Sequence, residues 1–148
     1  MEAHIEGVRV ADSPSGVVAV VTLGVEREDD VLPIFVGFEE ATSIARGLDA
    51  ADIGRPLTHD LLLDVMEELG GRVDRVVVSD LEEGTYIADL HIQTPRGAVV
   101  VDARPSDSLA LAARTNVGIE IADAVFEDGR EPLDEYEQLE DIRELVGV

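Results

Sequence analysis

The chain has 148 residues, and its 33 acidic side chains outnumber its 11 basic ones to give a formal net charge of −22. This length indicates one domain with room for its own core, and a 45% hydrophobic composition is too high for a disordered chain. The sequence contains no cysteine, which excludes disulfides, thiol nucleophiles and thiolate metal sites.

The apolar stretches are too short for a membrane helix. The longest, residues 17–25, has about half of the ~20 residues that a bilayer-spanning helix needs. The first residues also lack the basic segment and apolar run of a secretory signal. We therefore expect a cytoplasmic protein that makes no membrane contact.

The charge itself has two interpretations. All 11 basic residues are arginine, and the acidic residues are dispersed along the chain rather than gathered in one block. This pattern is typical of a halophilic protein, whose surface charges are screened because the Debye length in molar salt is about 3 Å. The net charge then reflects adaptation to a salt-rich solvent and does not exclude a nucleic-acid partner. The alternative is an ordinary acidic protein whose GC-rich genome favours arginine codons.

The first 50 residues predict three strands followed by a helix. Alternating and β-branched residues indicate the strands, which we place at 3–12, 16–25 and 31–36. From Phe38 the apolar residues recur with a helical period, and Glu39 and Glu40 suit the positive end of a helix.

A second helix is predicted to begin at Thr58, a suitable N-cap, and to end at Gly70-Gly71. Its helical spacing predicts a buried stripe formed by Leu61, Leu62, Val65, Met66 and Leu69. Three more strands, a helix and a short strand are predicted at 73–79, 85–94, 98–102, 105–116 and 117–122.

The two parts of the chain resemble each other. Each has three strands and then a helix with an acidic start, and Glu40-Ala41 and Asp107-Ser108 lie 67 positions apart. We therefore expect an α+β domain over residues 1–126, with two similar strand-rich halves and a mixed or antiparallel sheet.

The last segment, residues 127–148, contains nine acids and two arginines. We expect it to form one acidic C-terminal helix with Pro132 at its first helical position. Its apolar stripe would consist of Leu133, Tyr136, Leu139, Ile142 and Val146. This tail packs on its own domain or on a dimer mate in one interpretation, and binds another protein in the other.

Two helix starts carry residues suited to chemistry. The first comprises Arg55, His59 and Asp60, and the second comprises Asp102, Arg104 and Asp107. Arginine beside free helix N–H groups can hold an anion such as phosphate, carboxylates can hold Mg²⁺ or Mn²⁺, and histidine moves protons near neutral pH. The alternative is structural: Thr58 and Ser106 cap the helices, and the arginines pair with the nearby acids.

Three segments carry a family resemblance. Leu32-Pro33-Ile34-Phe35-Val36-Gly37 with Glu40-Ala41, the segment 55–61 and the segment 102–112 together resemble the bifunctional nuclease domain family, over about residues 3–126. The resemblance implies an α+β domain, a homodimer or larger homo-oligomer, and cleavage of RNA and DNA. Ser108 departs from the usual alanine of the family, and the acidic tail replaces the short helical repair-protein motif that some relatives append.

Our first functional hypothesis is a metal-assisted nuclease that acts on RNA or DNA. Asp102 and Asp107 would hold Mg²⁺ or Mn²⁺, and His59, oriented by Asp60, would be the general acid or base. The two arginines, Arg55 and Arg104, would stabilise the charge on the phosphate. The alternatives are a non-catalytic binding module for an anionic ligand or a protein partner, and an oligomeric scaffold.

Overall fold

A computed structural model describes residues 1–49 and 57–146, which form a mixed nine-stranded sheet and six helices. The first half contains β1 (Glu2–Ser13), β2 (Gly16–Val25), β3 (Asp30–Val36) and α1 (Phe38–Leu48). Helix α2 (Thr58–Glu68) leads into the second half, which contains β4 (Arg72–Glu82), β5 (Thr85–Thr94), β6 (Gly97–Ala103) and α3 (Pro105–Thr115). The remaining elements are β7 (Gly118–Ile121), α4 (Asp123–Gly129), β8 (Glu131–Pro132), α5 (Asp134–Glu137), β9 (Glu140–Asp141) and α6 (Ile142–Val146).

The duplicated pattern is visible in the sheet. Strands β1, β2 and β3 form one antiparallel unit, and β4, β5 and β6 form another. Strand β7 joins the two units, because it pairs with β4 in parallel and with β1 antiparallel. The order β6-β5-β4-β7-β1-β2-β3-β8 therefore confirms the predicted α+β fold with two similar halves.

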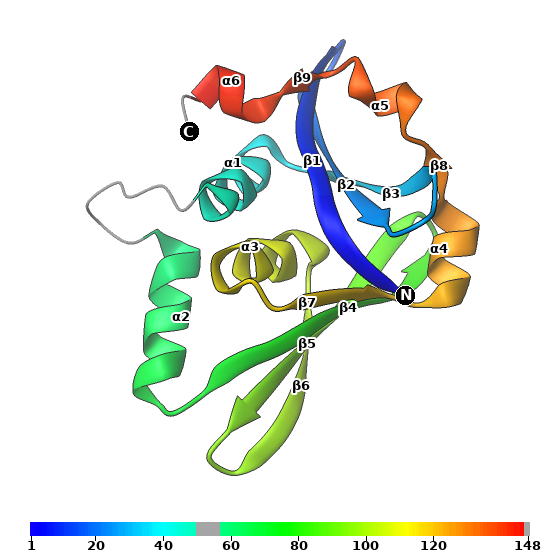
Figure 1. Cartoon of the computed structure of the whole chain (residues 1–148). Helices are drawn as coiled ribbons and strands as arrows, with labels where there is room; N and C mark the ends of the chain where they lie inside the picture. Colours follow the sequence, from blue (N-terminus) through cyan, green and yellow to red (C-terminus); the bar gives the residue numbers. More distant parts are fainter. Residues whose placement is uncertain (50–56, 147–148) are drawn as a thin grey trace.

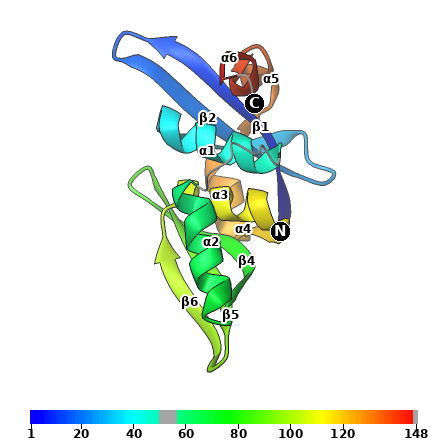
Figure 2. The same ribbon diagram turned by 90° about the vertical axis from the view of Figure 1, so that its left-hand side faces the viewer.

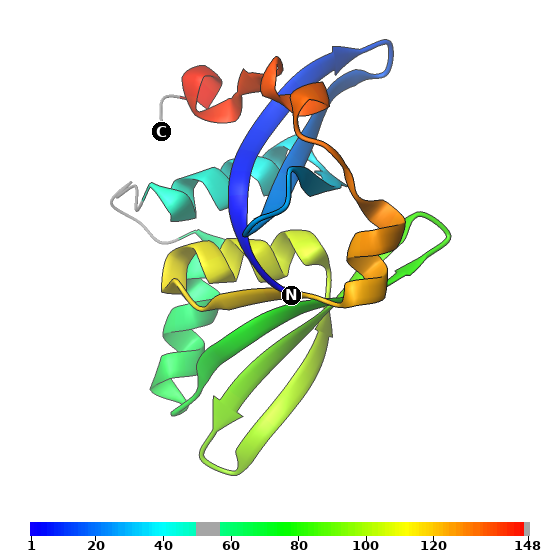
Figure 3. The same cartoon turned by 45° about the vertical axis from the view of Figure 1, so that its right-hand side comes forward.

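Helices α1 and α3 lie side by side between the two sheet units (Figures 1 and 3). Small residues allow this close approach: a Cβ added to Gly47 would lie 3.0 Å from the Cβ of Ala113. Ile44 of α1 and Leu109 and Leu111 of α3 are buried in the core. The packing brings the N-termini of α1 and α3 to the same end of the molecule. None of the described helices is long and apolar enough to cross a membrane.

The predicted buried stripe of α2 is wrong for four of its five residues, and Met66 is the one member that packs against the core. Leu61, Leu62, Val65 and Leu69 are 54%, 44%, 47% and 74% exposed, whereas Leu63 and Met66 pack against the core. The inward residues follow His59 at helical spacing, and His59 is held by polar groups of α1 and α3. We infer that the hydrogen bonds of His59 in the first turn determine which face of α2 is directed inward, and that the spacing of its apolar residues does not.

The start of α2 also differs from the prediction at Thr58. Thr58 is the first helical residue, and Leu57 occupies the N-cap position. The side chain of Asp60 compensates, because its Oδ2 accepts the backbone N–H of Leu57 at 3.0 Å. Such a bond from the third helical residue satisfies one of the free donors at the helix start.

The expected single C-terminal helix is split into short pieces. Strand β8 pairs with β3, and β9 pairs with β1, so two sheet positions interrupt the helical segments. Tyr136 packs with Val20 and Val31 in a small second cluster, and Ile142 is fully buried in the main core. Tyr136 and Ile142 thus pack on their own domain, but strand pairing at open sheet positions competes with a continuous helix.

Candidate functional site

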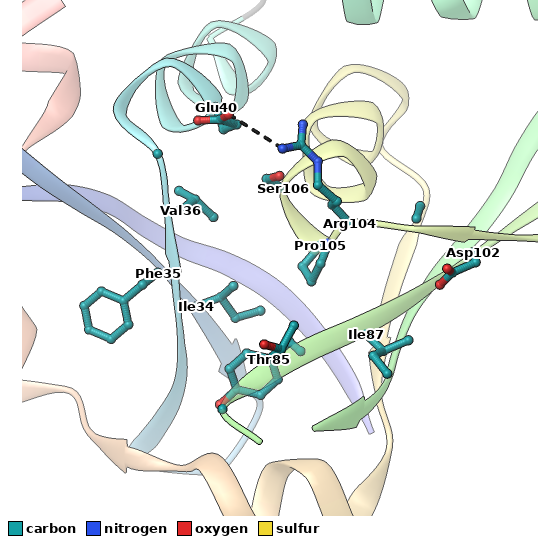
Figure 4. Close-up of a pocket in the computed structure, with 14 residues that line it drawn as sticks. Ile34, Phe35, Val36, Glu40, Thr85, Ile87, Asp102, Arg104, Pro105 and Ser106 are labelled. Atoms are coloured by element: carbon teal, nitrogen blue, oxygen red, sulfur yellow. Dashed lines mark ion pairs between the residues drawn. The ribbon is translucent and has the colours of Figure 1, made fainter. Parts of the chain in front are cut away.

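The candidate site lies where α1 and α3 begin. Glu40 and Asp107 are the third residues of these helices, so they occupy equivalent positions in the two halves. Arg104 lies between them: its Nη1 is 3.8 Å from Glu40 Oε1 (Figure 4). Its Nε donates to Asp107 Oδ2 at 2.9 Å. A second bond from Nη2 to Asp107 Oδ1, at 3.2 Å, makes the contact bidentate. The Arg104 side chain is 66% exposed, so its charge faces incoming ligands.

His59 joins this site from the first turn of α2. Its Nε2 lies 2.9 Å from Asp107 Oδ1, and its Nδ1 lies 2.7 Å from Ser43 Oγ on α1. Since an ionised carboxylate only accepts, we assign the ring proton to Nε2, and the Ser43 hydroxyl then donates to Nδ1. Three elements therefore fix one imidazole ring with one nitrogen directed at Asp107.

Arg114 supports the site from behind. It is almost fully buried, its Nε donates to Asp60 Oδ1 at 2.7 Å, and its Nη2 donates to Ser43 Oγ at 3.2 Å. Its Nη1 reaches the main-chain carbonyl oxygens of Ser43 and Ala110. Asp60 is therefore engaged with Arg114, and the groups that orient His59 are Ser43 and Asp107, in place of the predicted Asp60.

Both carboxylates of this network are ionised at neutral pH. Burial opposes the charge on Asp107, but hydrogen bonds from Arg104 and His59 outweigh it, so the pKa of Asp107 is below its usual value. The pKa of Asp60 is also lowered, because the bonds from Arg114 and the Leu57 N–H outweigh its burial. An ionised carboxylate that is hydrogen-bonded to an imidazole stabilises the ring in its positively charged form.

Two pockets meet at Arg104. The histidine pocket has a volume of about 370 Å³ and is lined by Glu39, Glu40, Ser43, Leu57, Thr58, His59, Arg104 and Asp107. The second, which we call the cleft pocket, has about 680 Å³ and lies between β3, the β4–β5 turn and the end of β6. Its wall is mainly apolar, with Ile34, Val36 and Ile87 beside the polar groups of Thr85 and Asp102 (Figure 4). Glu40 and Arg104 line both pockets.

The structure brings together three of the predicted site residues. His59, Arg104 and Asp107 are joined by direct hydrogen bonds although they come from two helix starts. Asp60 lies behind them on Arg114. The starts of α2 and α3 therefore meet in the fold.

The predicted metal ligands are not adjacent. Asp102 is exposed on β6 and lines the cleft pocket, whereas Asp107 lines the histidine pocket. Within residues 1–49 and 57–146, no group of three histidine or acidic side chains is arranged to hold a metal ion. The predicted Arg55 lies outside the described residues.

Sequence reasoning missed Ser43 and Arg114 and gave Glu40 no role beyond the helix dipole. The helical spacing of all three residues indicates that they belong to the site. Ser43 follows Glu40 by three residues, and Arg114 follows Asp107 by seven, so each pair lies on one helix face. A search for polar residues in phase with the helix-start acids would have found them.

Comparison with known proteins agrees with the motifs in the sequence. The chain matches the family model described as the bifunctional nuclease domain over residues 21–134. It is also similar to uncharacterized proteins of Mycobacterium tuberculosis strains CDC 1551 / Oshkosh and ATCC 25618 / H37Rv. Each is 40% identical to it over 125 residues, which is 84% of this chain and 73% of the relative. Since the family model matches residues 21–134, which are more than half of the chain and include His59, Arg104 and Asp107, the chain belongs to the bifunctional nuclease domain family.

Proposed function

We propose that this protein cleaves phosphodiester bonds of RNA or DNA at the histidine pocket. The observation that carries the proposal is the His59–Asp107 hydrogen bond beside the exposed guanidinium of Arg104. An imidazole held by a carboxylate moves protons, and a guanidinium binds phosphate oxygens in a bidentate manner. Membership of the nuclease domain family supports the same class of substrate.

The phosphate would bind at Arg104, where the two pockets meet. Helix α3 begins at Pro105, so the N–H groups of Ser106 and Asp107 point out of the helix start and add to the attraction for an anion. To bind phosphate, Arg104 exchanges its contacts with Glu40 and Asp107 for the phosphate oxygens. The nucleoside on one side of the phosphate would then lie in the apolar cleft pocket.

His59 would transfer the proton. The Nε2 proton is directed at Asp107 Oδ1, so His59 would exchange this contact for the leaving oxygen of the cleaved bond. The ring would donate this proton from its doubly protonated form and become the neutral imidazole, while a water molecule attacks the phosphorus and releases its own proton to solvent. Asp107 stabilises the ring as its charge changes, and Arg104 stabilises the charge on the phosphate oxygens. Glu39 and Glu40 oppose a phosphate in this pocket, and high salt weakens that repulsion.

A divalent metal remains a prediction from the sequence. Because Asp102 and Asp107 line different pockets, the described donors do not form a metal site in this arrangement. None of the steps above uses a metal. Cleavage measured with EDTA and with added Mg²⁺ or Mn²⁺ tests this part separately.

The proposal is tested with labelled single-stranded RNA and DNA in molar salt. His59→Ala should lower the cleavage rate by about 10²–10⁴-fold, since this is the usual contribution of general acid–base catalysis. His91→Ala is the matched control, because His91 is on β5 and lines neither pocket at Arg104. If both variants cleave at the wild-type rate, His59 has no catalytic role.

A non-catalytic binding module is the second candidate. The observation that favours it is that both ring nitrogens of His59 and both oxygens of Asp107 already have partners, as in a static polar network. This candidate predicts that pyrophosphate or an oligonucleotide raises the melting temperature, through Arg104, without any turnover. A homo-oligomer, which the family resemblance implies, is also part of the proposal.

A further inference from the structure

The two carboxylates that flank Arg104 occupy equivalent helix positions but have different partners. Asp107 accepts hydrogen bonds on both oxygens: Oδ1 accepts from His59 and from Arg104 Nη2, and Oδ2 accepts from Arg104 Nε. Glu40 lies 3.8 Å from Arg104 Nη1, a distance that makes an ion pair but is too long for a hydrogen bond. The contact with Arg104 therefore leaves the lone pairs of the Glu40 carboxylate free to accept a proton.

Glu40 is held at the start of α1 by close packing on the helix N-cap. This N-cap is Gly37, and a Cβ added there would overlap the Glu40 carboxylate. A glycine at this position thus makes room for the carboxylate, although its φ of −71° is accessible to any residue. The Glu40 side chain remains partly exposed and lines both pockets, so a ligand can reach it.

Glu40 and His59 lie at different edges of the Arg104 guanidinium. Glu40 is at the Nη1 end (Figure 4), whereas Asp107, which binds His59, is at the Nε edge. The first turn of α2, at the upper end of this helix in Figure 2, lies beside α1 and α3 and brings His59 to the pocket. A phosphate bound to Arg104 would therefore have a carboxylate on one side and an imidazole on the other.

This arrangement suits the attack of a ribose hydroxyl on the neighbouring phosphate. In an in-line displacement the attacking and leaving oxygens lie on opposite sides of phosphorus, so the base and the acid belong on opposite sides as well. In RNA the 2′-hydroxyl is attached next to the 3′-phosphodiester, and its attack gains the advantage of an intramolecular reaction. DNA lacks this hydroxyl, so its cleavage depends on a water molecule.

We propose that the 2′-hydroxyl of RNA is the nucleophile and that Glu40 is its general base. The Glu40 carboxylate takes the proton of the 2′-hydroxyl, the 2′-oxygen forms a bond to phosphorus, and the bond from phosphorus to the 5′-oxygen breaks. Doubly protonated His59 gives its Nε2 proton to that 5′-oxygen. The products are a 2′,3′-cyclic phosphate and a 5′-hydroxyl end. This step rests on the proposed function, and it makes RNA the preferred substrate.

The first test uses the wild type alone. The substrate is a labelled DNA oligonucleotide that contains a single ribonucleotide, incubated in molar KCl. We expect cleavage on the 3′ side of the ribonucleotide to be at least about 10²-fold faster than cleavage elsewhere. Mass spectrometry at early times should identify a 2′,3′-cyclic phosphate and a 5′-hydroxyl end. Cleavage at this position that leaves a 5′-phosphate would overturn the inference.

Variants test the role of Glu40 itself. Glu40→Gln should lower the rate of RNA cleavage by about 10²–10⁴-fold, the usual contribution of general acid–base catalysis. Because this change also removes a negative charge that opposes phosphate, KM should not rise. Gly37→Ala should slow cleavage in the same direction, since it displaces the carboxylate without removing it. Glu67→Gln is the matched control, because Glu67 is exposed on α2 and lines neither pocket at Arg104.

The outcomes distinguish this inference from the proposed function. RNA cleavage by Glu40→Gln at the wild-type rate, with an inactive His59→Ala, would overturn the role of Glu40 and retain the nuclease. Failure of the wild type to cleave either RNA or DNA would overturn both. Circular dichroism establishes that each variant is folded, and the chemistry of the product ends does not depend on any variant.

Discussion

Arg114→Ala should destabilise this protein far more than Arg104→Ala, although both arginines contact the same network. The Arg114 side chain is 8% exposed and makes four hydrogen bonds to Asp60, Ser43 and Ala110. Removing one partner of a buried ion pair lowers the free energy of unfolding by about 3–5 kcal/mol. Because Asp60 is 39% exposed, solvent screens part of this loss, and we expect about 2–4 kcal/mol. The melting temperature should then fall by about 5–15 °C.

Urea denaturation in molar salt, with constant m-value, measures this difference. Arg104 is 66% exposed, so Arg104→Ala should change the free energy of unfolding by less than about 1 kcal/mol while weakening phosphate binding. Arg114→Lys should recover part of the loss, because it keeps the charge but not the forked geometry. Equal stability of Arg114→Ala and the wild type, or a larger loss in Arg104→Ala, would refute this division of roles and favour a scaffold built on Arg104.

Three other predictions concern the network, the tail and the salt requirement. The pKa of Asp107 in the folded protein is below its usual value of 3.8, so its contribution to stability is present above that pH and is lost as the pH falls towards the folded pKa. Asp107→Asn should therefore flatten the dependence of the free energy of unfolding on pH below pH 3.8. Urea denaturation from about pH 2 to 6 measures this. Ile142→Ala should lower the free energy of unfolding by about 2–4 kcal/mol, because Ile142 is fully buried; a negligible change would show that the tail is dispensable for the core. With a net charge of −22, the melting temperature should fall when KCl is reduced from molar concentration to 0.1 M, and an unchanged melting temperature would contradict halophilic adaptation.

The strands and most helices were predictable because their signals are local. Alternation and turn residues place β1 to β6 within a few positions of the observed bounds, and the 67-residue repeat of Glu40 and Asp107 reflects a real structural duplication. Helix α3 also follows its pattern, with Pro105 in the first turn. These features depend on neighbours along the chain, so the sequence contains them directly.

The predictions that the structure contradicts concern regions where segments distant in the sequence meet. The rotation of α2 follows from His59 binding Ser43 and Asp107, which lie 16 and 48 residues away. The tail does not form one helix because β8 pairs with β3 and β9 pairs with β1. The spacing of apolar residues within the tail does not predict this pairing. The sequence predicts the candidate site residues at the two helix starts, but it predicts the wrong carboxylate partner for His59. Asp60 is adjacent to His59 in the sequence, yet its side chain binds Arg114.

The network of His59, Asp107 and Arg104 is proposed to cleave phosphodiester bonds. The most direct measurement is the initial rate of cleavage of labelled single-stranded RNA by the wild type and by the folded double variant His59→Ala/Asp107→Ala, purified in parallel. The proposed function predicts cleavage by the wild type and a loss of at least about 10²-fold in the double variant. Equal cleavage by both preparations would identify a contaminant as the nuclease and contradict the assignment.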